Sequence, residues 1–190
     1  MRKLKLQVQM TVNGFIAGPN GAMDWITFNW DEALKAYVTE LTEPVDCIVL
    51  GRNLAEGFIP HWASVAADPE HEEHLAGIKF SETPKVVFSH SLDQSKWDNT
   101  VVAQGGLVEE IEALKEQAGQ DIIVYGGADF VSDLIKHNLI DEYHLFVNPA
   151  AVGDGLPIFG EVNGRLNLKL VKAIPFDCGI VLLHYEPNQS

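Results

Sequence analysis

The segment 121–135, "DIIVYGGADFVSDLI", constrains the fold of this chain more than any other stretch. Four apolar or aromatic residues, 122–125, run directly into Gly126 and Gly127, and an amphipathic pattern begins at once. A strand that becomes a helix within two residues is typical of α/β sheets, which bind ligands at the carboxyl ends of their strands. Helix N-termini at that edge present unpaired N–H groups and the positive end of the helix dipole, which suits phosphate.

Two interpretations of the double glycine are open from the sequence. In the functional one, the main chain of Gly126, Gly127 and Ala128 cradles a diphosphate, because a residue without a β-carbon lets the backbone approach a ligand closely. In the structural one, the turn needs glycine only for its geometry. The pattern differs from the Gly-x-Gly-x-x-Gly of a Rossmann unit, so that fold is not predicted.

The rest of the chain repeats the alternation of strands and helices. Further strands are expected at 3–12, 45–51, 85–89, 99–103, 140–152, 166–176 and 179–187. Helices are expected at 31–41, 52–59, 68–78, 107–119 and 128–137, with Asp68 capping the third of them. Residues 13–28 carry three glycines and a proline and predict a long loop. This order predicts an α/β sandwich with a mostly parallel sheet and an antiparallel C-terminal hairpin.

Composition narrows the class of protein. A length of 190 residues with 46% hydrophobic residues suits one domain, residues 1–190. The formal net charge of −14 argues against a nucleic-acid partner, because phosphate binding needs a basic footprint. No apolar run approaches the ~20 residues that cross a bilayer, and the N-terminus alternates too much for a secretory signal. We therefore expect a soluble cytoplasmic protein without a membrane partner, with Cys47 and Cys178 as buried thiols.

Two more strand ends carry groups suited to an anion. Gly51 and Arg52 follow one buried strand, and Ser89 and His90 follow another. Arg52 is a fixed fork donor that matches phosphate, and Ser89 adds a hydroxyl. Singly, Arg52 also fits a surface salt bridge and Ser89 a turn cap. Together they supply the local donors that an acidic protein needs to hold a phosphorylated dinucleotide.

Five motifs resemble the dihydrofolate-reductase-like family, and more narrowly the branch with the reductase domain of bifunctional riboflavin-biosynthesis enzymes. They are "TVNGFIAGPNGAMDWI" (11–26), "VLGR" (49–52), "VVFSH" (86–90), "IVYGGADFVSDLI" (123–135) and "LIDEYHLFVNPAAVGDGLPIF" (139–159). The resemblance implies a three-layer sandwich around an eight-stranded sheet, an oxidoreductase with NADPH as hydride donor, and a homodimer. The apolar segment 148–159 is expected to pack either against a second subunit or within one chain.

The resemblance also implies which residues bind NADPH. They are Ala17 and Trp25 at the nicotinamide, Gly51, Arg52 and Asn53 at the phosphates, Ser89 and His90 near the adenosine ribose and its 2′-phosphate, and Gly126, Gly127, Ala128 and Asp129 at the diphosphate. Two positions depart from the family pattern. Leu54 stands where the Gly-Arg-x-Thr turn has its hydroxyl, and Asn13 stands where an Asp is expected. The first departure puts the strength of cofactor binding and the preference for NADPH in question.

The substrate side is less defined. Asp24 and Asp31 are the candidate catalytic acids, because a carboxylic acid can protonate a C=N bond during reduction. Asp31 equally fits a helix cap. We expect an NADPH-dependent reductase of a small heteroaromatic or imine substrate, similar to a pterin or a ribosylaminopyrimidine. The alternative is a non-catalytic nucleotide- or flavin-binding module on the same scaffold.

No metal site is expected from the sequence. In "HEEH" (71–74) the histidines lie three apart rather than the four that a zincin needs, which favours a solvated helix face. The chain also lacks a deaminase-type zinc motif, so a second activity of that kind is not predicted.

Overall fold

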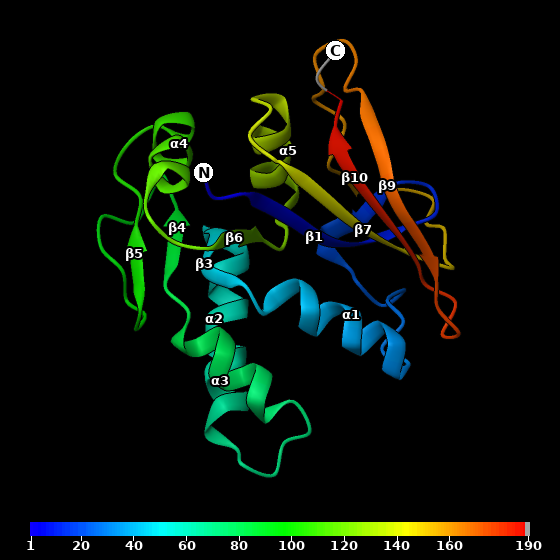
Figure 1. Ribbon diagram of the computed structural model, residues 1–190, viewed down its shortest axis with the longest axis horizontal. Helices are drawn as coiled ribbons and strands as arrows, with labels where there is room; N and C mark the ends of the chain where they lie inside the picture. The colour runs from blue at the N-terminus through cyan, green and yellow to red at the C-terminus, as the bar shows by residue number, and fades with distance from the viewer. Residues whose placement is uncertain (189–190) are drawn as a thin grey trace.

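A computed structural model of the chain describes residues 1–188. Its main sheet has eight strands (Figure 1). Their spatial order is β5 (Thr100–Val102), β4 (Lys85–Phe88), β3 (Val45–Gly51), β6 (Asp121–Val124), β1 (Leu4–Thr11), β7 (Glu142–Asn148), β10 (Val181–Pro187) and β9 (Leu168–Pro175). The strands from β5 to β7 are parallel, and β10 runs antiparallel to both β7 and β9. The predicted α/β architecture, mostly parallel with an antiparallel C-terminal hairpin, is confirmed.

The long loop after β1 is partly ordered by a second, small sheet. In it β2 (Phe15–Ala17) pairs antiparallel with β8 (Leu156–Pro157), and a short 3-10 turn, η1 (Pro19–Gly21), follows β2. Gly155 permits this contact, because a β-carbon there would collide with the carbonyl oxygen of Ala17. Ile158 is fully buried in the core of the same chain, and its carbonyl accepts a hydrogen bond from Ser132. The within-chain alternative therefore describes this part of the segment 148–159.

Helices cover both faces of the main sheet. They are α1 (Glu32–Thr42), α2 (Arg52–Ala67), α3 (His74–Glu82), α4 (Leu107–Glu116) and α5 (Ala128–Lys136). Figure 1 shows α4 and α5 on one face and α1, α2 and α3 on the other. None of the helices within residues 1–188 combines the length and the apolar character that crossing a membrane requires.

The alternation in β1 explains how the two faces differ. Leu4, Leu6, Val8 and Met10 point into the large core under α4 and α5, as the period-two pattern predicts. The residues between them, including Lys5 and Gln7, face the opposite side, where polar side chains are also buried. On that side two smaller apolar clusters form, one under α2 and α3 and one under α1.

Two predicted helix boundaries were wrong. α2 runs sixteen residues and passes through Pro60, because its apolar stripe of Ala55, Ile59 and Val65 stays buried across that position. Asp68 ends α2 instead of starting the next helix, and its carboxylate accepts the N–H of Glu70 in a turn. An Asp-Pro pair fits a turn as well as a helix start, so the sequence signal was ambiguous. α3 begins six residues later, at His74.

Candidate functional site

The sheet brings the three predicted strand ends together at one edge. β3 lies between β4 and β6, with Gly51 opposite Phe88 and Val49 opposite Val124 in the register. The junctions that follow these strands therefore lie side by side at the carboxyl edge. They are 51–52, 89–90 and 126–127. The loop after β1 leaves the sheet at the same edge, next to β6.

Gly126 and Gly127 owe their identity to backbone torsions. Their φ angles are +145° and +83°, a region that side chains with a β-carbon rarely adopt. A β-carbon at either position would meet only ordinary contacts, at 4.0 Å from Val8 and 3.8 Å from Phe130. Gly127 is the N-cap of α5 and offers no side-chain cap, so the first N–H groups of that helix have no side-chain acceptor there. This turn has the form of an anion cradle.

Glycine is required at position 51 for a different reason. Its φ of −72° is open to any residue, but a β-carbon there would lie 2.9 Å from the β-carbon of Phe130. The close packing of α5 on the β3–α2 junction therefore requires this glycine. Its role as a ligand contact is not needed to explain its presence.

The residues after Gly51 leave cationic and amide groups exposed. Arg52 and Asn53 are exposed in the first turn of α2, and that helix also has no side-chain cap. None of the salt bridges of residues 1–188 involves Arg52. The alternative role of Arg52 as a surface salt-bridge partner is therefore not supported. Leu54, in place of the family hydroxyl, packs against the apolar cluster under α2.

Ser89 acts as a turn cap. Its hydroxyl oxygen accepts the N–H groups of Ser91 at 3.1 Å and Leu92 at 3.0 Å. The hydroxyl hydrogen is still available as a donor. His90 is exposed beside it. The structure thus shows the capping role and leaves the cofactor role as a prediction.

The loop that carries Ala17 and Trp25 is anchored to the sheet by Asn148. This fully buried residue ends β7, accepts the N–H of Thr27 at 2.9 Å and donates to Gln9 at 2.8 Å. Ala17 is buried in the β2–β8 pair. The indole N–H of Trp25 is buried and has no acceptor within residues 1–188. An unpaired buried donor of this kind fits a loop that a polar ligand completes.

The two candidate acids have different surroundings. Asp31 caps α1 through the N–H of Leu34 at 2.8 Å, and its other oxygen accepts the N–H of Cys178 at 3.1 Å. The bond from Leu34 is the main cause of its lowered pKa, so the group is ionised at neutral pH. Its contacts are those of the capping interpretation. Asp24 is exposed in the loop after β2.

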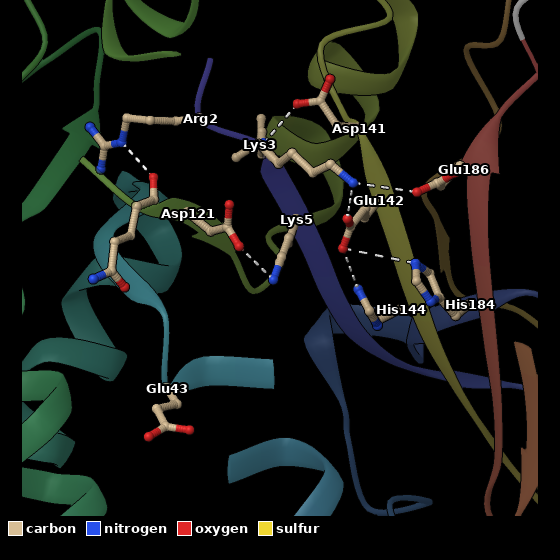
Figure 2. Close-up of polar contacts among 12 residues, drawn as sticks. Arg2, Lys3, Lys5, Glu43, Asp121, Asp141, Glu142, His144, His184 and Glu186 are labelled. Atoms are coloured by element: carbon tan, nitrogen blue, oxygen red, sulfur yellow. Dashed lines mark hydrogen bonds and ion pairs between the residues drawn. The ribbon is translucent and has the colours of Figure 1, made fainter. Parts of the chain in front are cut away.

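Sequence reasoning missed a polar cluster on the buried face of β7 and β10. It consists of Glu142, His144 and His184 (Figure 2). Burial opposes the ionisation of Glu142, but hydrogen bonds from His144 and Lys3 lower its pKa to about 2. Burial is also the main cause that lowers the pKa of His184 to about 4. The only sequence signal was the spacing Glu142-x-His144, which places two polar side chains on one face of a strand.

Two surface hollows lie away from the glycine turn. One, of about 780 Å³, is lined by Asp46, Lys85 and Thr100 among others, and the second, of about 320 Å³, by Asn138 and Arg165 among others. The first lies at the amino ends of β3, β4 and β5, the opposite edge of the sheet from Gly126. We assign no ligand to them.

Comparisons with known proteins agree with this architecture. The family model for the RibD C-terminal domain matches residues 2–182. The protein YyaP of Bacillus subtilis (strain 168) is 34% identical over 191 residues, which cover 98% of this chain and 96% of that protein. The riboflavin biosynthesis protein RibD of Corynebacterium ammoniagenes is 23% identical over 157 residues, but the match covers 80% of this chain and only 44% of RibD.

Solved structures show the same fold at low identity. The diaminohydroxyphosphoribosylaminopyrimidine deaminase/5-amino-6-(5-phosphoribosylamino)uracil reductase of Thermotoga maritima has a TM-score of 0.70 and 21% identity. That match covers 98% of this chain and 57% of the Thermotoga chain. RibD of Acinetobacter baumannii has a TM-score of 0.72 and 18% identity, covering 100% of this chain and 59% of that one. In both cases this chain corresponds to little more than half of the larger protein.

Proposed function

This chain belongs to the RibD C-terminal domain family, and on that premise we propose that it is an NADPH-dependent reductase of a small heteroaromatic or imine substrate. One observation carries the proposal most directly. Gly126 and Gly127 form an uncapped, positive-φ turn at the start of α5, on the same sheet edge as two other strand-end junctions. Turns of this kind suit a diphosphate.

The residues of the edge fit a phosphorylated dinucleotide in separate ways. In the proposal, the main chain from Gly126 to Asp129 holds the diphosphate. Arg52 and Asn53 are exposed at the start of α2 and meet its phosphates, with Ser89 and His90 at the adenosine ribose and its 2′-phosphate. NADPH, when bound, supplies a hydride. Ala17 and Trp25, held by the Asn148 anchor, border the nicotinamide and exclude water from it.

Two relatives support the proposed substrate class. RibD of Corynebacterium ammoniagenes is a riboflavin biosynthesis protein, and the Thermotoga protein is a deaminase and 5-amino-6-(5-phosphoribosylamino)uracil reductase. We therefore propose a pyrimidine- or pterin-like heterocycle related to riboflavin biosynthesis as the substrate. Asp24 is the proposed proton donor, since both oxygens of Asp31 already accept main-chain N–H groups.

Titration with both dinucleotides tests the proposal. We expect NADPH to quench tryptophan fluorescence and raise the melting temperature more than NADH does, because only NADPH carries a 2′-phosphate. Sodium sulfate at matched ionic strength is the control for nonspecific anion effects. Neither quenching nor a melting shift with either dinucleotide at millimolar concentration would contradict the proposal.

A non-catalytic nucleotide- or flavin-binding module is the second candidate. It is favoured by Leu54, which offers no hydroxyl to a phosphate, and by the engagement of Asp31 in its cap. Turnover assays with pterins, nitro compounds and pyrimidines separate the two. If the chain is a reductase, at least one of these compounds should accelerate NADPH oxidation. If it is a binding module, NADPH or flavin should bind without oxidation of NADPH.

We also propose a cytoplasmic homodimer. β9 is an edge strand of the main sheet, and Leu170 and Val171 on it are about half exposed, at 51% and 46%. Such an edge is normally paired or covered. Light scattering during size-exclusion chromatography is expected to give twice the chain mass, and a monomer across the micromolar range would refute this part. Cell fractionation tests the location.

A further inference from the structure

The side chains of Glu142, His144 and His184 form a compact cluster. The Nε2 atom of His144 lies 3.2 Å from Oε2 of Glu142, and Nε2 of His184 lies 3.8 Å from the same oxygen. The ligand atoms of all three residues lie within 4.8 Å of one another. The two imidazole rings stack at 4.2 Å between centroids (Figure 2). Two imidazole nitrogens therefore lie within 3.8 Å of one carboxylate oxygen, although the nearly parallel rings must turn before both nitrogens can point at one ion.

Strands β7 and β10 and helix α1 enclose the cluster. Glu142 and His144 are two apart on β7 and share a face, and His184 is directly opposite His144 on β10. Tyr37 of α1 covers the group, with its hydroxyl 2.8 Å from Nδ1 of His144. His144 is 3% exposed. The three side chains thus come from rigid elements.

We propose that Glu142, His144 and His184 bind a divalent transition-metal ion of the Zn²⁺ class. Metal–ligand bonds of about 2.0–2.1 Å in a tetrahedral site put ligand atoms roughly 3.3–3.5 Å apart. The two separations from Oε2 of Glu142, 3.2 and 3.8 Å, come within a few tenths of an ångström of that spacing, and the two histidine nitrogens lie within 4.8 Å of each other. Two imidazoles with one carboxylate favour Zn²⁺ over Ca²⁺ or Mg²⁺, which prefer oxygen ligands alone.

The surroundings of the cluster support a metal. Nε2 of His184 and Oε1 of Gln7 are both buried without a hydrogen-bond partner within residues 1–188. A bound ion satisfies the first, and a water in the fourth position can donate to the second, since Gln7 pairs with His144 in the register. When the ion takes Nε2 of His144, the ring proton moves to Nδ1 and donates to the Tyr37 oxygen. Such an outer hydrogen bond is usual for a metal-bound histidine.

Two neighbouring lysines pair with carboxylates, one of which is Glu142 itself. Lys3 pairs with Glu142 at 2.6 Å and also with Glu186 at 3.4 Å, and Lys5 pairs with Asp121 at 2.7 Å (Figure 2). The ammonium groups of Lys3 and Lys5 are therefore paired, whereas Lys172 on β9, opposite His184, has no carboxylate partner within residues 1–188. Lys3 holds Oε1 of Glu142 and leaves Oε2 to face the histidines.

The site is separate from the dinucleotide edge. Glu142 is at the amino end of β7 and Asn148 at its carboxyl end, six residues apart, or roughly 20 Å at about 3.3 Å per residue. The ion would join β7 to β10 beneath α1. The role of the ion would be structural. The metal-site proposal does not depend on whether the chain is a reductase.

The test uses tag-free full-length chain, stripped with a chelator and titrated with Zn²⁺ by calorimetry. We expect one equivalent per chain and a higher melting temperature in the zinc form. His184→Ala is expected to weaken Zn²⁺ binding by about 100-fold, and Tyr37→Phe by about tenfold. The matched control is the double variant His71→Ala/His74→Ala, which removes two histidines of the "HEEH" segment and is expected to bind as the wild type does.

A second measurement on the wild type guards against a variant that fails to fold. Zinc should shift the imidazole NMR resonances of His144 and His184 and leave those of His71 and His74 in place. Wild-type chain that takes up less than one equivalent, equal affinity for His184→Ala, or unshifted resonances of His144 and His184 would each overturn the proposal.

Discussion

The carboxyl edge of the sheet and the Glu142 cluster are two polar regions made by opposite means. At the edge, the chemical groups are main-chain amides, exposed because Gly126 and Gly127 have positive φ and α5 has no side-chain cap. In the cluster, the groups are side chains, one carboxylate and two imidazoles, buried between α1 and two strands. The first region leaves its polar groups for a ligand at little cost to the fold. In the second, the fold itself depends on the polar groups being satisfied.

Glu142→Gln should have the largest effect on the free energy of unfolding. The change removes the carboxylate charge that pairs with Lys3. The same carboxylate also accepts a hydrogen bond from the buried His144. We expect the metal-free protein to lose about 3 kcal/mol, because a buried network left with one partner missing is strongly destabilised. Urea unfolding measures it. Lys35→Ala, which removes an exposed pair with Glu32, is the control and should leave the free energy of unfolding nearly unchanged. Equal losses for the two variants would remove the contrast between the regions.

Asn148→Ala should come next, at about 2 kcal/mol. It deletes the acceptor for Thr27 and the donor to Gln9 at a fully buried position. The amide of Thr27 should then exchange hydrogen faster, because the loop of residues 13–28 has lost its anchor. Asn148→Asp keeps an acceptor for Thr27 and should protect that amide better than Asn148→Ala. The anchor role would be wrong if exchange at Thr27 were the same in both variants.

Gly51→Ala should cost about 1.5 kcal/mol through a clash with Phe130, as over-packing usually does. Gly57 is the matched control. It lies inside α2 with open space around it, so Gly57→Ala should stabilise the protein by about 0.7 kcal/mol. Thermal and urea unfolding give both values. A neutral Gly51→Ala would mean that α5 can shift at this junction.

Gly127→Ala should cost about 1 kcal/mol, since alanine is strained at a φ of +83°. It should nonetheless weaken dinucleotide binding about tenfold or more, because the main chain of the cradle must turn. Fluorescence titration at a temperature where the variant is fully folded separates the two effects. Unaltered NADPH affinity would place the diphosphate elsewhere.

Arg52→Ala should change stability least, by under about 0.5 kcal/mol, since Arg52 is exposed and forms no salt bridge within residues 1–188. It should weaken NADPH more than NADH if the guanidinium or its neighbours touch the 2′-phosphate. Arg52→Lys keeps the positive charge but not the planar guanidinium, and its affinity for NADPH should fall between those of the wild type and Arg52→Ala. Equal losses for both dinucleotides would exclude a 2′-phosphate contact.

The two regions also differ in how far the sequence predicts them. Gly126 and Gly127 are adjacent, follow an apolar run and precede an amphipathic one, so a local pattern predicts the turn and its edge. The Glu142 cluster joins residues 42 positions apart through the pairing of β7 with β10, and alternation alone gives no partner for a strand. The packing reason for Gly51 was hidden likewise, because it depends on Phe130 of a distant helix.

Helix boundaries show the same limit on a smaller scale. The cap at Asp31 was among the predicted alternatives because side chain and helix start are three residues apart. The end of α2 was misplaced because burial on β3 and β4, not local propensity, carries the helix past Pro60. Local signals therefore gave the order of the helices and of the main-sheet strands, but they missed β2 and β8 of the small sheet.

The central position of β1 has a consequence for biosynthesis. The strand made first pairs with β6 and β7, so that Leu4 meets Ile122 and Lys5 meets Glu142. At ribosomal rates of about 5–20 residues per second, its apolar face waits on the order of ten seconds for its neighbours. A nascent chain of this topology therefore leaves that face without its partner strands until the second half emerges, and stalling before residue 142 should make it prone to aggregation.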